Sequence, residues 1–388
     1  MGVTIDERAG LARRGFERFA SAEGFIRELL EKAGIEIGGR ASHDIVVHDR
    51  RFFDRVARDG PLGFGESYMD GWWDAPAVDE LITRIHQAKL ADVIPKNVKY
   101  VASALKAKLL NLQTRRRSFE VGRRHYDVGN DLYRAMLDKR LVYTCGYWKD
   151  ATNLDDAQEA KLDLVCRKLG LREGMRVLEL GCGWGSFAKY AAEKYGVSVT
   201  GYTVSKEQHA LGTELCAGLP VDLRLEDYRN ATGTYDRVVS IGIMEHVGSK
   251  NYRAYMEVVD RCLAPGGVSL IHTIASPTSD DVPDPWTVKY IFPNGSVPSL
   301  AMLARAMEGL FAIQDVHAFG PYYDPTLMAW YRNFTAAWPA LKARYDERFF
   351  RMWNYYLLMS AAAFRSHYAH LLQIVMTRPD TPPPATAR

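Results

Sequence analysis

The sequence lacks a hydrophobic run long enough to cross a membrane, and it begins without an apolar signal region. The longest nearly unbroken apolar stretch runs from Tyr355 to Phe364 and contains Ser360. It is about half of the roughly 20 residues that a bilayer requires. At the N-terminus, Asp6 stands where a myristoylation signal needs Ser or Thr. These absences predict a cytoplasmic protein with neither a membrane span nor a lipid anchor.

Cysteine is scarce, and the five cysteines are far apart in the sequence: Cys145, Cys166, Cys182, Cys216 and Cys262. An odd, scattered set argues against a disulfide framework, and no pair has the close spacing of a zinc site. We therefore expect a reducing compartment and no metal.

Net charge is also small, at +3, because 50 Lys and Arg balance 47 Asp and Glu. The charge is unevenly placed, however. Residues 96–124 hold nine cations and one acid, so this segment carries +8 and leaves the rest of the chain at −5. Apolar residues recur between the cations at helical spacing, which predicts a basic amphipathic linker. Such a linker is either a solvated helix face or a site for lipid headgroups or nucleic-acid phosphates.

The pattern along the chain predicts two domains. Residues 1–95 combine a helical pattern with an aromatic-rich, glycine-punctuated stretch, which favours a small N-terminal domain that associates with lipid. Residues 125–377 are the predicted catalytic domain, and residues 378–388, with four prolines, are a predicted disordered tail.

Within the predicted catalytic domain, short β-branched runs alternate with helical stretches. The expected strands are 176–180, 197–202, 237–241 and 268–274, and the chain after Pro298 is expected to be mainly helical. This alternation predicts an α/β fold, a Rossmann-like, mostly parallel sheet with helices on both faces.

A glycine-rich turn follows the first of these strands. Gly181, Gly183 and Gly185 depart from the NAD fingerprint, and no acid ends the second strand. Instead, Asp227 follows a further short strand at 223–225, and a Pro-Gly-Gly turn precedes the last strand. This order is typical of class I methyltransferases that use S-adenosylmethionine. A generic nucleotide-binding sheet is the alternative.

Further motifs narrow the choice: His125-Tyr126-Asp127-Val128-Gly129, Tyr143-Thr144-Cys145-Gly146-Tyr147-Trp148, Met244-Glu245-His246-Val247-Gly248, Ile271-His272-Thr273-Ile274, and the segments 65–73, 290–295 and 323–331. Together, and in this order from about residue 30 to residue 376, the chain resembles the cyclopropane-fatty-acyl-phospholipid synthase family. The resemblance implies transfer of a methylene from S-adenosylmethionine to a cis double bond in a phospholipid acyl chain.

The resemblance also implies site residues. A bound bicarbonate would act as the base, held by Cys145, Glu245, His272, Ile274 and Tyr323. The cofactor would contact Tyr126, Tyr143, Thr144, Gly181, Gly183, Gly185, Thr203, Gln208 and Asp227, with Tyr133 beside them. Methyl transfer to carbon needs no enzyme nucleophile, so Cys145 is expected to shape the anion pocket. Ser360 stands where many relatives have cysteine, which indicates that no thiol is required there.

Other functions stay open at this stage. A small-molecule N-methyltransferase and a methyl-branching lipid C-methyltransferase share the fold, and a non-catalytic lipid-binding protein is harder to sustain. Nucleic-acid methylation is disfavoured, because Gly242-Ile243-Met244-Glu245 replaces the Asn/Asp-Pro-Pro motif after the fourth strand. We expect a homodimer that binds the inner face of the membrane through residues 96–124 and the N-terminal domain.

Overall fold

The computed structural model describes residues 21–90, 129–280, 284–382, 384 and 387–388. Within these residues, no helix is both long and apolar enough to cross a bilayer. Contacts divide the chain into two units. The first comprises residues 1–110, 284–291 and 338–368, and the second comprises residues 111–283, 292–337 and 369–388.

The second unit is built on a seven-stranded sheet with the order β5-β4-β3-β6-β7-β9-β8. The strands are β3 (Arg176–Leu180), β4 (Ser198–Thr203), β5 (Val221–Leu225), β6 (Tyr235–Ile241), β7 (Leu263–Ala275), β8 (Ala312–Ala318) and β9 (His370–Thr377). The first five are parallel, and β9 pairs antiparallel with both β7 and β8. The predicted α/β class and the four expected strands are confirmed.

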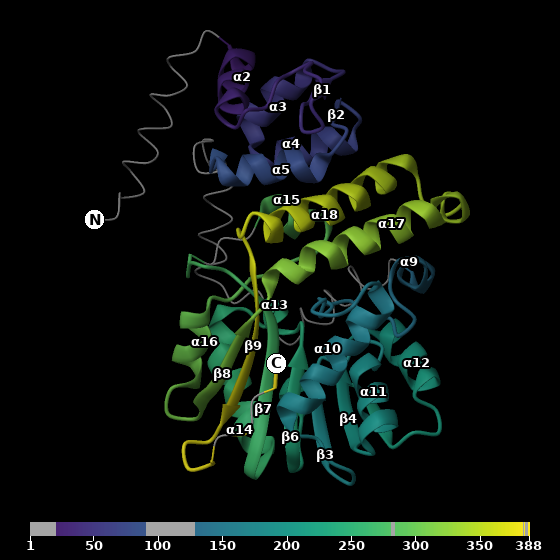
Figure 1. Cartoon of the computed structure of the whole chain (residues 1–388), viewed down its shortest axis with the longest axis vertical. Helices are drawn as coiled ribbons and strands as arrows, with labels where there is room; N and C mark the ends of the chain where they lie inside the picture. The colour runs from purple at the N-terminus through teal and green to yellow at the C-terminus, as the bar shows by residue number, and fades with distance from the viewer. Residues whose placement is uncertain (1–20, 91–128, 281–283, 383, 385–386) are drawn as a thin grey trace. The chain divides into compact units, whose positions relative to one another are not determined.

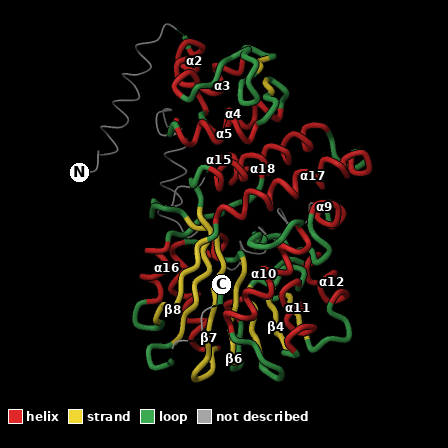
Figure 2. Tube along the Cα trace, viewed as in Figure 1, coloured by secondary structure: helices red, strands yellow, loops and turns green. Residues whose placement is uncertain are grey.

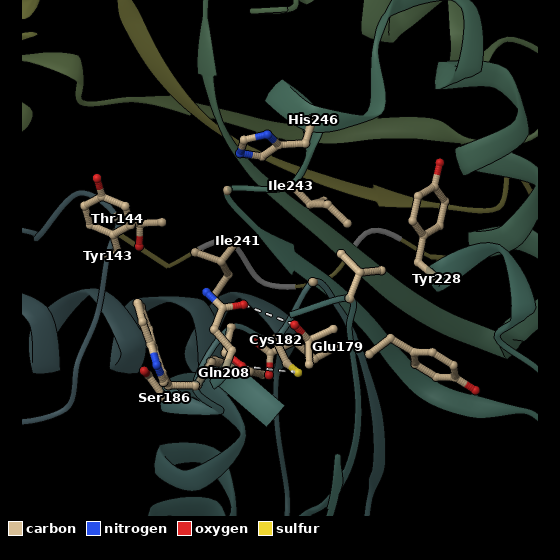
Figure 3. A pocket seen from close by; sticks show the side chains of 18 of the residues that line it. Tyr143, Thr144, Glu179, Cys182, Ser186, Gln208, Tyr228, Ile241, Ile243 and His246 are labelled. Atoms are coloured by element: carbon tan, nitrogen blue, oxygen red, sulfur yellow. Dashed lines mark hydrogen bonds between the residues drawn. The ribbon is translucent and has the colours of Figure 1, made fainter. Parts of the chain in front are cut away.

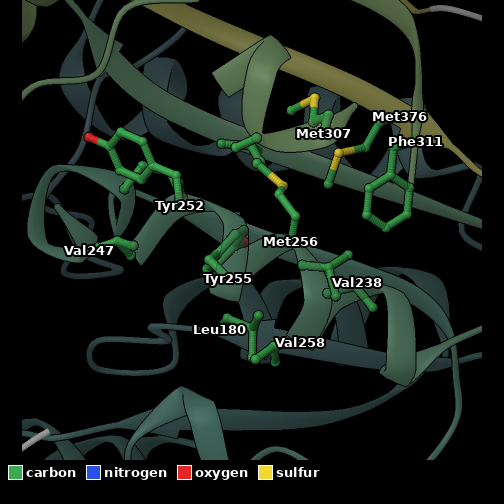
Figure 4. Close-up of a cluster of buried hydrophobic side chains, with 14 of the residues drawn as sticks. Leu180, Val238, Val247, Tyr252, Tyr255, Met256, Val258, Met307, Phe311 and Met376 are labelled. Carbon is green, nitrogen blue, oxygen red and sulfur yellow. The ribbon is translucent and has the colours of Figure 1, made fainter. Parts of the chain in front are cut away.

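Helices cover both faces of this sheet because its strands are apolar on both sides. In β3, Val177 packs into one buried cluster and Leu178 into the other; in β6, Val239 and Val238 divide in the same way. Successive strand residues point to opposite faces, so a fully buried strand reads as a continuous apolar run. Figure 4 shows the cluster that contains Leu180, Val238 and Tyr255.

The covering helices include α10 and α11 on one face and α14 and α16 on the other. The helices of this unit are α9 (Asn130–Met136), α10 (Leu154–Leu169), α11 (Ser186–Tyr195), α12 (Lys206–Leu215), α13 (Met244–Val247), α14 (Tyr252–Cys262), α16 (Leu300–Met307) and most of α17 (Tyr323–Leu341). The expectation of a mainly helical chain after Pro298 missed β8 and β9.

The first unit packs helices around aromatic side chains. Its elements are α2 (Ala22–Lys32), β1 (Val46–Val47), α3 (Arg51–Asp59), α4 (Pro61–Met69), β2 (Trp73–Asp74), α5 (Val78–Gln87), α15 (Pro285–Tyr290) and α18 (Glu347–Arg365). Phe52 and Trp73 are fully buried, and the Trp73 indole donates to the Phe64 carbonyl. These aromatics therefore form core.

Segment 284–291 packs against α4 at a glycine. A Cβ on Gly65 would lie 2.5 Å from the Trp286 ring, so only glycine admits the indole there. The neighbouring Glu66 accepts from the Lys289 ammonium at 2.5 Å and from the Tyr290 hydroxyl at 2.8 Å. A short segment distant in sequence is thereby fixed to the N-terminal helices.

This grouping differs from the expected division of the chain. The sequence assigns residues 284–291 and 338–368 to the catalytic domain, whereas contacts group them with the N-terminal residues. The expected boundaries near residues 95 and 125, and the basic linker between them, lie outside the described residues. In the tail, Arg388 forms an ion pair with Asp315, and Arg378 donates to Asp260 at 2.7 Å.

Candidate active site

A cavity of about 190 Å³ lies beside the carboxyl ends of β3, β4 and β6 in the second unit. Open α/β sheets bind ligands at this edge. Seven predicted cofactor residues line the cavity: Tyr143, Thr144, Gly181, Gly183, Thr203, Gln208 and Asp227. Figure 3 shows Tyr143 and Thr144 across the cavity from Glu179, Cys182 and Gln208.

The glycine turn is tied to the neighbouring strand. The Gly181 and Cys182 amides both donate to the Tyr202 carbonyl, at 3.0 and 2.9 Å. Gly181 and Gly183 have φ of 80° and 54°, a region that side chains rarely adopt, so these positions favour glycine. The third glycine, Gly185, caps α11 and is not among the cavity's lining residues.

The polar groups at the end of β4 are held in place. The Thr203 hydroxyl donates to Gln208 Oε1 at 3.1 Å. Ser205 caps α12, because its hydroxyl accepts from the backbone N–H of Gln208. The resemblance implies that Thr203 and Gln208 both contact the cofactor, and the structure brings the two side chains together on the cavity wall.

Asp227 is 3% exposed and follows β5. It accepts from the Arg229 guanidinium at 2.8 Å and from the Arg229 amide at 3.0 Å. Both carboxylate oxygens are therefore fixed by the same residue at the cavity wall. The contact of this carboxylate with the cofactor, which the resemblance implies, stays a prediction.

Two buried charged residues at the cavity were not predicted as site residues. Lys161 on α10 is fully buried and donates from Nζ to Thr144 Oγ1 at 2.8 Å; burial lowers its pKa to about 8. Glu179 on β3 is 3% exposed, and burial raises its pKa to about 8. Its Oε2 atom has no hydrogen-bond partner among the described residues. No sequence motif indicates Lys161 as a site residue. Glu179 could have been predicted, because it is an acidic residue inside an apolar strand.

His246 on α13 also lines the cavity and was not predicted to do so. Burial lowers its pKa to about 4, so the imidazole is neutral near pH 7. Its place in the Met244–Gly248 motif, next to Glu245, was the available signal.

Two predicted anion-site residues carry buried polar atoms without partners in the described part of the chain. Glu245 Oε1 accepts from the Ile274 amide at 2.6 Å, while Glu245 Oε2 is unpaired. His272 on β7 is 1% exposed, and its Nε2 atom is likewise unpaired. Burial, with the positive charges of Lys161 and Lys168, holds the pKa of His272 well below its usual value. Burial raises the pKa of Glu245 to about 7.

Cys145 and Tyr323 complete the predicted anion set. Cys145 is fully buried, its thiol donates to the Gly146 carbonyl at 3.2 Å, and burial raises its pKa far above the usual value. Such a thiol is not an activated nucleophile. Tyr323 begins α17 and is 6% exposed.

The predicted anion set adjoins the cavity without lining it. Gly242, which does line the cavity, donates its amide to the His272 carbonyl at 2.9 Å. A Cβ on Gly242 would lie 2.8 Å from Thr144, so β6 and the Thr144 segment meet closely here. Of the predicted site residues, only Tyr126 lies outside the described residues.

Residues 113–374 match the family described as mycolic acid cyclopropane synthetase. The chain belongs to this family. It is 50% identical over 351 residues to the cyclopropane-fatty-acyl-phospholipid synthase of Escherichia coli strain K12, covering 90% of this chain and 92% of the relative.

Comparison with solved structures supports the same family assignment. A mycolic acid cyclopropane synthase complexed with SAH and CTAB superposes with a TM-score of 0.63 at 33% identity, over 66% of this chain and 97% of that one. Coclaurine N-methyltransferase gives a TM-score of 0.68 at 20% identity, over 81% and 98%, which shows the shared fold alone. The chain is an S-adenosylmethionine-dependent methyltransferase.

The residues at the cavity fit this cofactor. The positive-φ glycines leave backbone at the cavity wall, and the unpaired Glu179 carboxylate oxygen can accept from an ammonium group. A nearby cation would favour the ionised form of this carboxyl and offset the cost of burial.

Proposed function

We propose that the enzyme adds a methylene from S-adenosylmethionine to cis double bonds of phospholipid acyl chains, with bound bicarbonate as the base. A relative that is 50% identical over 90% of this chain is a cyclopropane-fatty-acyl-phospholipid synthase, which supports the substrate class.

One observation carries the proposal of a bound anion. Glu245 Oε2 and His272 Nε2 are an acceptor and a ring nitrogen that burial deprives of water and that have no partner among the described residues. Unpaired buried polar atoms cost free energy, so each of these two atoms is suited to a polar guest. Bicarbonate offers both an O–H donor for Glu245 and oxygens that accept from an N–H.

The chemistry requires alignment and a base. S-adenosylmethionine supplies an electrophilic methyl group on a sulfonium. An alkene is a weak nucleophile, so the protein must hold it in line with that methyl, and positioning accounts for much of the barrier. After attack, the lipid carries a carbocation, and loss of a proton from the added methyl closes the ring. Glu245 and His272 would hold the base that takes this proton.

Mass spectrometry of lipids from expressing cells tests the reaction. We expect a gain of one CH2 with loss of the double bond. Methylated amines with unchanged acyl chains would instead indicate an N-methyltransferase, and a methyl branch would indicate that the cation is reduced.

The role of bicarbonate is tested with purified enzyme and vesicles of unsaturated phospholipid. Turnover in CO2-depleted buffer should rise when bicarbonate is restored, and Glu245→Gln and His272→Asn should weaken this response. Turnover that ignores bicarbonate would contradict the proposed base.

We further propose that the enzyme works as a homodimer at an anionic bilayer surface. The +8 segment 96–124 in a chain of net charge +3 supports membrane association, because basic segments bind anionic headgroups. Light scattering of the purified protein tests the dimer, and a monomeric mass would contradict it.

A further inference from the structure

Three polar residues face one another across three strands of the sheet. In β9, Gln373 pairs in register with His272 of β7 on one side and with His317 of β8 on the other. Residues in register on adjacent strands project to the same face. Gln373 is fully buried, so its amide lies in the sheet interior, where an aliphatic side chain would cost less.

The side-chain amide of Gln373 lies against one of the two imidazole nitrogens of His272, and its Oε1 atom has no hydrogen-bond partner among the described residues. Its Nε2 atom lies 3.2 Å from His272 Nδ1. An amide nitrogen can only donate, so Nδ1 accepts. In a neutral imidazole, the proton then resides on Nε2, the ring atom that has no partner among the described residues.

The surroundings favour the neutral ring that this arrangement needs. Lys168 on α10 is 1% exposed and lies with Nζ 3.1 Å from His317 Nδ1 and 3.5 Å from Asp315. Together with Lys161, it opposes a positive charge on His272. The Phe319 ring, 5.9 Å from the imidazole, adds an apolar wall.

We propose that Gln373 is a positioning residue that holds His272 in the Nε2–H tautomer, ready to donate to the anion. This inference rests on the proposed function for the identity of the anion, but the tautomer itself belongs to the resting protein. Without the amide, both tautomers become available, and one of them presents a lone pair to an anion. That would repel the anion instead of binding it.

The experiment measures ring nitrogen shifts of His272 by NMR in protein carrying 15N-histidine, with His272→Asn to assign the signal. We expect the Nε2–H tautomer in the wild type. Gln373→Glu places a carboxyl group beside Nδ1; in its ionised form this group can only accept, and it should then move the proton to Nδ1. Turnover should fall between about 10-fold and 10⁴-fold, the range seen when a group orienting a functional histidine is replaced.

A matched control is Gln314→Glu on β8. Gln314 donates from Nε2 to the Thr377 hydroxyl at 2.8 Å, and a hydroxyl can donate as well as accept. The same chemical change there should alter neither the His272 tautomer nor turnover. Methionine has a similar volume to glutamine but no amide, so Gln373→Met should give a mixture of the two His272 tautomers. This variant also allows the tautomer to be measured if Gln373→Glu does not fold.

Three results would overturn the inference: an Nδ1–H tautomer in the wild type, an unchanged tautomer in both Gln373 variants, or a switched tautomer with unchanged turnover. A wild-type enzyme that ignores bicarbonate would instead count against the proposed function. The positioning role is therefore tested by the tautomer, and by how turnover follows the tautomer, whether or not turnover depends on bicarbonate.

Discussion

At the scale of single residues, burial sets the charge of the groups around the site. Glu179 and Glu245 have raised pKa values, and those of Lys161 and His272 are lowered, in each case chiefly because burial disfavours the charged form. Neutral groups cost less to bury, and they become charged when a ligand supplies the opposite charge. Near pH 7 the Glu179 carboxyl and the His272 ring are therefore mainly neutral, whereas Lys161 remains mainly protonated.

This burial gives Glu245 a measurable effect on stability. Its pKa is about 7 in the folded protein against an ordinary value of 4.5, so the folded state binds more protons between these values. Stability should therefore fall as pH rises from about 4.5 to 7, by on the order of 3 kcal/mol from this carboxyl. Urea unfolding of Glu245→Gln across this range should lack that component of the slope, and identical slopes for variant and wild type would contradict the raised pKa.

Cys145 should not be essential for the chemistry. Its thiol is buried, protonated and bonded to the Gly146 carbonyl. Cys145→Ser should keep turnover within about tenfold, whereas removing a true nucleophile costs about 10⁶-fold. Steady-state kinetics with vesicles measures this, with Cys262→Ser, also buried, as a control for the Cys-to-Ser change. A loss of many thousandfold at Cys145 alone would restore the nucleophile interpretation.

Single residues also mark the limit of sequence interpretation. The resemblance singled out Glu245 and His272, and each has a buried polar atom without a partner in the part of the chain that the structure describes. Lys161 and Gln373 could not be found in this way. Gln373 meets His272 across about a hundred residues of chain, and only strand register brings them together.

At the scale of elements, the sequence predicts those strands whose residues form a continuous apolar run. Strands β3 and β6 are largely buried and stand out as short apolar runs. Strand β8 is at the sheet edge and is mostly half-buried, so Gln314, Asp315 and His317 interrupt its pattern. Strand β9 holds Gln373 at its centre and follows the long helix α18. Edge position and a buried polar residue therefore explain why these two strands were missed.

The glycine turn depends on the close approach of β4. A Cβ on Gly201 would lie 2.8 Å from Leu223 and 2.9 Å from Cys182, next to the turn. Gly201→Ala should therefore destabilise the protein by about 1–3 kcal/mol through overpacking and weaken cofactor binding. Urea unfolding and calorimetric titration of S-adenosylhomocysteine measure the two effects.

Gly24 in α2 provides the comparison for this substitution. Among the described residues, only Ser21 Oγ, at 3.5 Å, would lie near an added Cβ, and alanine is the better helix former. Gly24→Ala should raise stability by up to about 1 kcal/mol without changing cofactor affinity. Equal effects of the two substitutions would contradict the packing argument for Gly201.

At the scale of the whole molecule, the first unit draws on three separate stretches of chain. Residues 284–291 and 338–368 pack with the N-terminal helices, although the methyltransferase motifs surround them in sequence. Helical periodicity shows that these stretches are amphipathic but not which partner they cover. The partner becomes visible only through contacts such as Gly65 with Trp286 and Glu66 with Lys289.

The net charge of +3 conceals the +8 of residues 96–124, which lie outside the described part of the chain. If this segment brings the enzyme to anionic headgroups, replacing Arg115, Arg116 and Arg117 with glutamine should weaken vesicle binding by about 3 kcal/mol, at roughly 1 kcal/mol per cation. Binding of the wild type should also weaken as salt rises, because counterions screen the attraction. Sedimentation with vesicles of anionic and of neutral lipid measures both effects.

A matched variant distinguishes the effect of the charges in residues 96–124 on vesicle binding from the effect of the overall net charge. Lys194, Lys250 and Lys342 are exposed, and replacing them with glutamine removes the same three charges elsewhere. We expect this variant to bind anionic vesicles as the wild type does, with cofactor affinity unchanged in both variants. Equal losses in the two would mean that overall charge drives association, and no loss in either would mean that the enzyme reaches its lipid substrate without the basic segment.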